Sequence, residues 1–171
     1  MNASAVPKPA LRPFLAADGP LLAQIFRDSI AELTSDDYDE AQQAAWMSRA
    51  DDEARFAESL ATSLTLVATV AHAPVGFVSL DGGDHIDKLY VHPSMAREGI
   101  GMLLCDAIEK LAQARGATRL TTDASDTARP LFERRGYEAR HRQTVALGAE
   151  WLGNTRMEKK LEPSARRDQS R

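Results

Sequence analysis

The sequence predicts an α/β fold with a mixed sheet, in which an antiparallel meander is followed by a parallel strand–helix–strand crossover. Apolar residues keep a helical spacing to about residue 61, and the period then changes to that of strands between 64 and 91. A long amphipathic helix between two further strands completes the pattern. The chain has 171 residues, 43% hydrophobic and 27% charged, which is typical of one globular domain. We expect that domain over 9–161, with flexible tails at 1–8 and 162–171.

The first part of the chain is predicted to be mainly helical. A short strand over 11–15 leads to Asp18, which we expect to cap a helix whose apolar residues keep their spacing up to Leu33. Alanine and aromatic residues predict two more helices, over 38–48 and 51–60.

The middle of the chain predicts three antiparallel strands. They cover 64–71, 75–80 and 86–91, where apolar and β-branched residues dominate. Turn residues separate them at 72–74 and 81–84.

One helix is predicted with particular clarity, over 99–115. Apolar residues form a single stripe along it, and Gly116 ends it. The following strand, over 119–124, should run parallel to the strand over 86–91, because a strand, a helix and a strand in succession form a crossover. The remaining segments are a short helix over 127–135 and closing antiparallel strands over 137–147 and 154–161.

Charge and composition exclude several classes of function. The chain has 21 basic and 25 acidic residues and shows no basic stripe for nucleic acid; four arginines are interpreted as a solvated surface, Arg134, Arg135, Arg140 and Arg142. No apolar run reaches the about 18 residues that span a bilayer, and the first 15 residues lack the apolar core of a signal peptide. We therefore expect no membrane association and a cytoplasmic location.

The sequence shows neither a disulfide nor a metal site. The single cysteine, Cys105, cannot form an intramolecular disulfide, and its place in the apolar stripe predicts a buried, inert thiol. The four histidines and this cysteine lack the spacing of zinc ligands, so no metal is expected.

Two glycines mark the start of the long helix. Gly99 and Gly101 lie between a strand that ends near Pro93 and the helix. The first amides of a helix have no internal acceptors, and the helix dipole adds positive charge there, so a diphosphate should bind the amides of 97–102. The alternative is that both glycines only shape a tight turn.

Single residues exclude two other kinds of phosphate-binding motif. A nucleotide phosphate loop needs lysine where this chain has Met102, and a dinucleotide fingerprint needs a third glycine where it has Leu104.

Several motifs together resemble the GNAT superfamily of acetyl-CoA-dependent N-acetyltransferases. They are Leu89-Tyr-Val-His-Pro, Gly99-Ile-Gly, Asp123-Ala-Ser and Phe132-Glu-Arg-Arg-Gly-Tyr137. Within it, Ile86-Asp-Lys-Leu-Tyr-Val and Trp151-Leu-Gly-Asn-Thr-Arg-Met-Glu-Lys resemble the YafP-like branch. The resemblance covers about residues 9–161.

The resemblance implies that two central strands splay apart and that acetyl-CoA lies in the gap, with its pantetheine arm placed like an added strand. The contacts implied are main-chain groups at Leu89, Tyr90 and Val91, the loop at Arg97, Glu98, Gly99, Ile100, Gly101 and Met102, and a wall of Ser125 and Phe132.

The sequence departs from the family pattern at three positions. Ala96 stands where relatives often have Gln or Arg, and Ser125 where many have Asn. Phe132 replaces the tyrosine that often protonates the departing thiolate, a role that Tyr137 or a water could take.

Two residues are candidates for the base that accepts the proton of the amine. His85 aligns with the usual family glutamate, and Asp87 lies two residues on, on the same strand face. The alternatives are a partly exposed His85 beside a turn, and an Asp87 paired with Lys88, Arg119 or another cation.

The implied function is N-acetyltransferase activity, in which a primary amine of a small molecule or peptide attacks acetyl-CoA directly. Tyr38 and Trp46 are assigned to acceptor binding, or to core packing. A non-catalytic acyl-CoA-binding regulatory module and a cofactor-free interaction domain are the alternative functions. A closing strand could also pair with a second subunit to form a homodimer.

Overall fold

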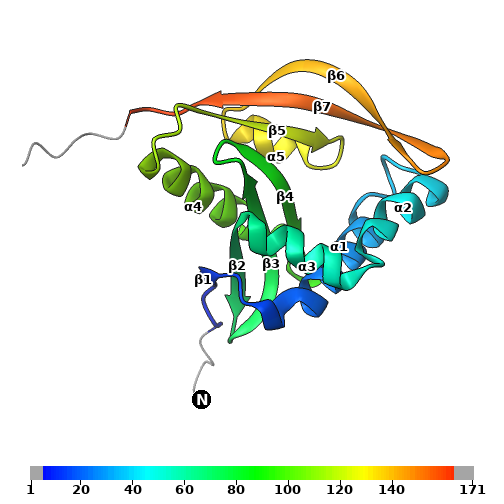
Figure 1. Cartoon of the computed structure of the whole chain (residues 1–171), viewed down its shortest axis with the longest axis horizontal. Coiled ribbons are helices and arrows are strands. Elements are labelled where there is room, and N and C mark those ends of the chain that lie inside the picture. The colour runs from blue at the N-terminus through cyan, green and yellow to red at the C-terminus, as the bar shows by residue number, and fades with distance from the viewer. Residues whose placement is uncertain (1–5, 164–171) are drawn as a thin grey trace, which may run out of the picture.

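One seven-stranded sheet organises the molecule (Figure 1). The computed structural model describes residues 6–163, so most of the predicted tails, residues 1–5 and 164–171, lie outside the described residues. The strand order is β1-β2-β3-β4-β5-β7-β6. Every neighbouring pair is antiparallel except β4 and β5, which are parallel. The mixed sheet and the parallel pair confirm the predicted fold class.

The structure contains each element that the sequence predicts. The strands are β1 (Ala10–Pro13), β2 (Leu64–Val70), β3 (Ala73–Asp81), β4 (His85–Val91), β5 (Arg119–Ser125), β6 (Glu138–Leu147) and β7 (Glu150–Lys160). The α-helices are α1 (Gly19–Leu33), α2 (Glu40–Met47), α3 (Glu53–Thr62), α4 (Ile100–Ala114) and α5 (Arg129–Arg134). Short 3-10 turns cover Ala16–Asp18, Ser48–Ala50 and Pro93–Met95.

Two strands begin two or more residues earlier than predicted. β7 begins at Glu150 instead of residue 154, because its whole length pairs with β6 from the Leu147↔Glu150 pair onward. β3 begins at Ala73, since Ala71 and His72 alone form the turn, both with positive φ. Turn residues near a strand end are a weak guide to the last paired residue.

Asp18 occupies the N-cap position of α1, as predicted, but its side chain does not cap the helix. The Asp18 carboxylate makes no capping bond to α1 and instead accepts two hydrogen bonds from the Arg12 guanidinium, at 2.7 and 2.8 Å. It also accepts a bond from the Leu15 amide at 2.8 Å. The ion pair lowers the pKa of Asp18 and ties β1 to the start of α1.

Helices cover both faces of the sheet. α4 packs Leu104 and Ile108 against Ile86 and Leu120 on one face, and all four side chains are fully buried. On the other face, α1 and α3 form an aromatic core over β3 and β4. Its members are Phe26, Phe56, Phe77 and Tyr90.

No helix in the described part of the chain, residues 6–163, is long and apolar enough to span a bilayer.

Candidate active site

The two parallel strands of the sheet separate after two paired residues. β4 and β5 pair only at His85↔Thr121 and Ile86↔Thr122. Beyond these two pairs, no other described residues of β4 and β5 are paired with each other. A cleft of about 330 Å³ opens between the two strands. The splay that the family resemblance implies is therefore present.

A β-bulge in β4 lies where the strands separate. Leu80 pairs with Ile86 and Ser79 with Lys88, so Asp87 is an extra residue without a partner on β3. Bulges bend a strand and increase its twist. The bend turns the second half of β4 away from β5.

The open edge of β4 carries unpaired peptide groups. The His92 amide donates to the Val75 carbonyl on the β3 side, at 2.7 Å. Because main-chain groups alternate between the two edges of a strand, those of Leu89 and Val91 face the gap toward β5. The edge can therefore accept another extended chain.

The N-terminus of α4 offers free donors beside this gap. Among residues 6–163, no acceptor is bonded to the amides of Arg97, Gly99, Ile100, Gly101 or Met102. The first helical bond at this end runs from the Leu103 amide to Gly99 O, at 3.0 Å. The Glu98 amide is an exception, because it donates to Met95 O at 3.3 Å, so it is not among the free donors expected over 97–102.

The two glycines of this turn serve different purposes. Gly99 has a φ of 82°, which other residues rarely adopt, and a Cβ there would meet nothing within 4 Å. Gly101 is helical, but a Cβ there would lie 2.8 Å from Leu131 Cδ1. Gly101 thus allows close packing, whereas Gly99 allows a backbone turn and leaves space in front of it.

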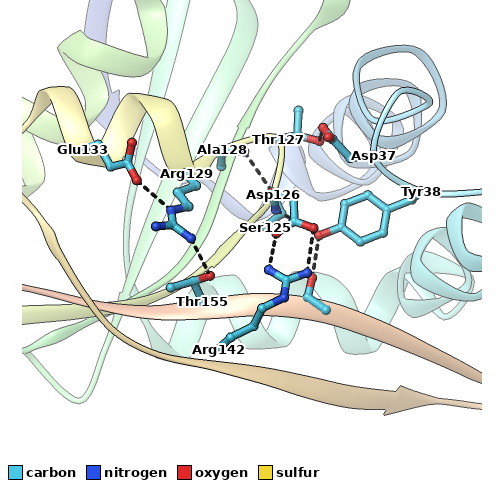
Figure 2. Close-up of polar contacts among 11 residues, drawn as sticks. Asp37, Tyr38, Ser125, Asp126, Thr127, Ala128, Arg129, Glu133, Arg142 and Thr155 are labelled. Carbon is cyan, nitrogen blue, oxygen red and sulfur yellow. Dashed lines mark hydrogen bonds and ion pairs between the residues drawn. The ribbon is translucent and has the colours of Figure 1, made fainter.

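The opposite wall of the cleft comes from β5, α5 and β7. Phe132 is buried and presents an apolar ring there. The Ser125 Oγ accepts a bond from the Ala128 amide at 3.1 Å, as Figure 2 shows, which leaves its own proton available. The Asn154 Oδ1 is buried without a partner in the described structure. No sequence pattern assigns a role to Asn154, which lines the cleft.

His85 lies in the cleft lining and is held on two sides. Its Nδ1 shares a hydrogen bond of 2.8 Å with the Thr121 hydroxyl, and its Nε2 lies 3.9 Å from Asp123 Oδ2. Asp123 in turn accepts bonds from Arg156, at 2.6 Å, and from Gln143, at 2.8 Å. The Asp123-Ala-Ser motif was known from the sequence, but its contact with His85 depends on the parallel pairing.

Asp87 also lines the cleft but is not a buried, unpaired carboxylate. Its side chain is 43% exposed, and its Oδ2 lies 2.5 Å from Lys88 Nζ. The bulge causes this exposure, because it removes Asp87 from the regular alternation of the strand. The ion pair with Lys88 is the alternative that the sequence left open.

Tyr38 and Trp46 both line the cleft and both take part in packing. The Tyr38 hydroxyl donates to Gly153 O at 2.7 Å and accepts from the Asp126 amide at 3.0 Å (Figure 2). Burial raises the pKa of Tyr38. The Trp46 ring packs edge-on against Tyr38, with centroids 5.4 Å apart, and its Nε1 donates to Tyr90 Oη at 3.2 Å. The two aromatic residues thus join the helical segment to the strands that form the cleft.

Tyr137 lies outside the cleft lining, contrary to its predicted role as a proton donor there. Its side chain is buried between α4 and β7, with Lys159 Nζ 5.6 Å from the ring centroid, and its hydroxyl lies beside Glu109 without a hydrogen bond of normal geometry in the described structure. Burial, with the nearby charge of Glu109, raises the pKa of the Tyr137 hydroxyl. The segment after α5 places Tyr137 in the core, and no local sequence pattern indicates this burial.

One of the four arginines predicted to form a solvated surface, Arg135, lies in the same region. Arg135 is not part of a solvated surface, because its guanidinium pairs with the buried carboxylate of Glu109. Lys159 Nζ reaches the same carboxylate at 3.1 Å. Cys105 lies nearby and is buried as predicted, and burial raises the pKa of its thiol to about 12.

Comparisons with known proteins agree with this geometry. A family model described as an acetyltransferase (GNAT) domain matches residues 34–161. A protein of Escherichia coli (strain K12), described as the uncharacterized N-acetyltransferase YafP, is 34% identical over 144 residues, which are 84% of this chain and 91% of that protein.

Two solved structures extend the comparison. A crystal structure from Rhodopseudomonas palustris, described as a GCN5-related N-acetyltransferase and as a class-II aminotransferase, is 54% identical, with a TM-score of 0.89 over 94% of this chain and 100% of that one. The PaiA N-acetyltransferase of Thermoplasma acidophilum, solved with coenzyme A, shares the fold, with a TM-score of 0.75 at 17% identity over 90% and 99% of the two chains.

The position of Tyr137 generates a prediction about stability. Tyr137→Phe removes a buried hydroxyl without a partner and keeps the ring that packs on Phe132, so the free energy of unfolding should rise by about 1 kcal/mol. Urea denaturation measures this change. Turnover should stay at the wild-type level, and a large loss of turnover would return Tyr137 to the catalytic residues.

Proposed function

The chain belongs to the GNAT family of acetyltransferases, and we propose that it transfers the acetyl group of acetyl-CoA to a primary amine of a small molecule or peptide by direct attack. One observation carries the proposal: the gap between β4 and β5 opens beside the free amides at the N-terminus of α4. A diphosphate on those amides and an extended arm along the edge of β4 fit this geometry together.

The donor would be held mainly by main-chain groups. The amides of Arg97, Gly99 and Ile100, with those of Gly101 and Met102, would bind the diphosphate at the positive end of α4. Peptide groups of Leu89 and Val91 would pair with the pantetheine arm as a neighbouring strand does. On the opposite wall, the Ser125 hydroxyl is free to donate and the Phe132 ring supplies apolar contact.

Bound acetyl-CoA supplies an acyl group that is already activated as a thioester. The protein then has to polarise the carbonyl and accept a proton from the amine. The Leu89 amide, which faces the gap, is a donor in position for the first task. His85 is the favoured group for the second, because its imidazole lines the cleft, Thr121 binds its Nδ1, and its Nε2 makes no hydrogen bond in the described structure.

The leaving group needs no protein acid in this proposal. Phe132 has no hydroxyl, and Tyr137 lies outside the cleft lining. A thiol with a pKa of about 8.5 leaves readily as the thiolate, which water can protonate.

An acetyl-transfer assay tests the proposed function. Purified protein is mixed with acetyl-CoA and a panel of primary amines, and release of free thiol is followed. We expect saturable, amine-dependent release. Thermal stabilisation by acetyl-CoA without any thiol release would favour the alternative, a non-catalytic acyl-CoA-binding module, for which the missing hydroxyl at Phe132 is the motivating observation. No stabilisation at all would contradict both.

Gly99→Ala tests the diphosphate site. The methyl group enters the open space in front of the α4 amides, so the Kd for coenzyme A should rise at least about tenfold, measured by calorimetry. The positive φ of Gly99 also makes the substitution costly for stability, by about 1–2 kcal/mol.

Gly116→Ala is the matched control for this strain. Gly116 has a φ of 95°, a Cβ there also meets nothing within 4 Å, and it lies at the other end of α4. Both variants should lose similar stability, but only Gly99→Ala should bind coenzyme A more weakly. Equal affinities in the two variants would mean that Gly99 only shapes the turn.

His85→Gln tests the proposed base. At pH 7 the variant should lose about 100-fold or more in kcat, because the glutamine amide cannot accept the proton of the amine. Its thermal stabilisation by acetyl-CoA should match that of the wild type, because His85 does not contact the donor in this proposal.

Asp87→Asn separates the two candidate bases. The carboxylate is exposed and paired with Lys88, so kcat should fall by no more than about fivefold. A loss as large as that expected of His85→Gln would assign the proton transfer to Asp87 instead.

A further inference from the structure

A second hollow adjoins the cleft on the face covered by α1 and α3. It has a volume of about 410 Å³ and is bounded by α1, α3 and β4. Four residues line both spaces: Trp46, Arg49, Asp87 and Tyr90. A molecule that reaches the cleft from this face would therefore lie against both sets of side chains.

Aromatic rings form the apolar wall of this hollow. The Phe26 ring packs edge-on against Tyr90, with centroids 4.6 Å apart, and lies 5.3 Å from the Phe56 ring. Burial raises the pKa of Tyr90, so its hydroxyl stays neutral and accepts the bond from Trp46. Phe26 and Phe56 are almost fully buried, so the half-buried rings of Trp46 and Tyr90 present most of the aromatic surface to an apolar part of a ligand.

The two carboxylates of the lining already have partners. Asp87 is paired with Lys88. Asp52 is the N-cap of α3 and accepts a bond from the Arg55 amide, at 3.0 Å. Neither carboxylate forms an ion pair with an arginine.

The two guanidinium groups of the lining, Arg49 and Arg55, have no partners. No acceptor among residues 6–163 is hydrogen-bonded to either of them. Ion pairs with a carboxylate are common among the other arginines of the described chain. Eight of them form one: Arg12, Arg27, Arg119, Arg129, Arg135, Arg140, Arg142 and Arg156. Three cations and two anions line the hollow, although the chain as a whole has a net charge of −4.

We propose that the acceptor is a primary amine that carries a carboxylate beside an apolar group, and that Arg49 and Arg55 bind this carboxylate. The inference rests on the proposed function, since it names the substrate class of the same site. Arginine presents paired N–H donors that match a carboxylate, and the aromatic wall accepts the apolar group. Arg49 lines both spaces, so a carboxylate held there leaves the amine free to enter the cleft near His85.

Matched substrates test the proposal. Phenylalanine, leucine and tryptophan are each compared with the corresponding carboxamide, in the wild type and in Arg49→Gln and Arg55→Gln. For the acids, kcat/KM should fall about 10- to 100-fold in Arg49→Gln, through a higher KM, and to a smaller extent in Arg55→Gln. For the carboxamides, kcat/KM in both variants should stay within about twofold of the wild-type value. Comparing ratios between variants cancels the different reactivity of the two amines.

Arg115→Gln is the control variant. Arg115 is exposed, has no ion pair in the described structure and lies outside both linings. It should leave the acid and amide rates unchanged. If Arg115→Gln lowers the acid rates as much as Arg49→Gln, or if the acid-to-amide ratio is the same in Arg49→Gln and the wild type for every pair, the proposal is overturned.

Two further arms complete the test. The phosphonate analogue of phenylalanine distinguishes the anion: in the wild type its kcat/KM should be lower than that of phenylalanine, and a higher value would overturn the carboxylate assignment. If no amine is acetylated, the proposed function fails, and calorimetry with N-acetylphenylalanine and coenzyme A decides the arginine site by itself. Weaker binding to Arg49→Gln than to the wild type supports the site, and equal binding overturns it.

Discussion

The structure depends on the parallel strands β4 and β5, whose pairing stops after two residue pairs. β4 and β5 share two registered pairs and then separate at the bulge that contains Asp87. Peptide groups that would have completed the ladder face the gap, and main-chain donors and acceptors away from water need a partner. The rest of the fold keeps this opening in place: α4 packs Ile108 on one face of the sheet, and α1 packs Phe26 on the other.

The same packing places the N-terminus of α4 at the gap. Ile100 and Leu104 are buried against the sheet, so the first turn of the helix is fixed close to the open edge of β4. Gly101 lets the same turn pack closely against α5, because a Cβ there would lie 2.8 Å from Leu131 Cδ1. Free amides of the helix and free peptide groups of the strand therefore lie along one path, which suits a long ligand with a charged segment and an extended polar segment.

The two faces of the sheet differ in electrostatics in a way that suits two substrates. The proposed donor side uses neutral peptide groups and a helix dipole, and Arg49 and Asp87 are among the residues that line both spaces. On the acceptor side, the carboxylates are engaged and the guanidinium groups of Arg49 and Arg55 are free. A charge that is complementary to a ligand but not neutralised within the protein contributes to specificity.

The sequence by itself determined the elements, their order, the glycine turn before α4 and the positions of His85 and Asp87 on one strand. These properties depend on periodicity and on the chemistry of neighbouring residues, which are local. Only the tertiary structure decided that the bulge exposes Asp87, that Asp123 lies beside His85, and that Arg49 and Arg55 share one hollow. It also buried Tyr137 beside Glu109, outside the lining of the cleft. The contacts of His85 with Asp123 and of Tyr137 with Glu109 join segments distant in the sequence. The bulge and the shared hollow depend on strand register and side-chain packing, which no local pattern encodes.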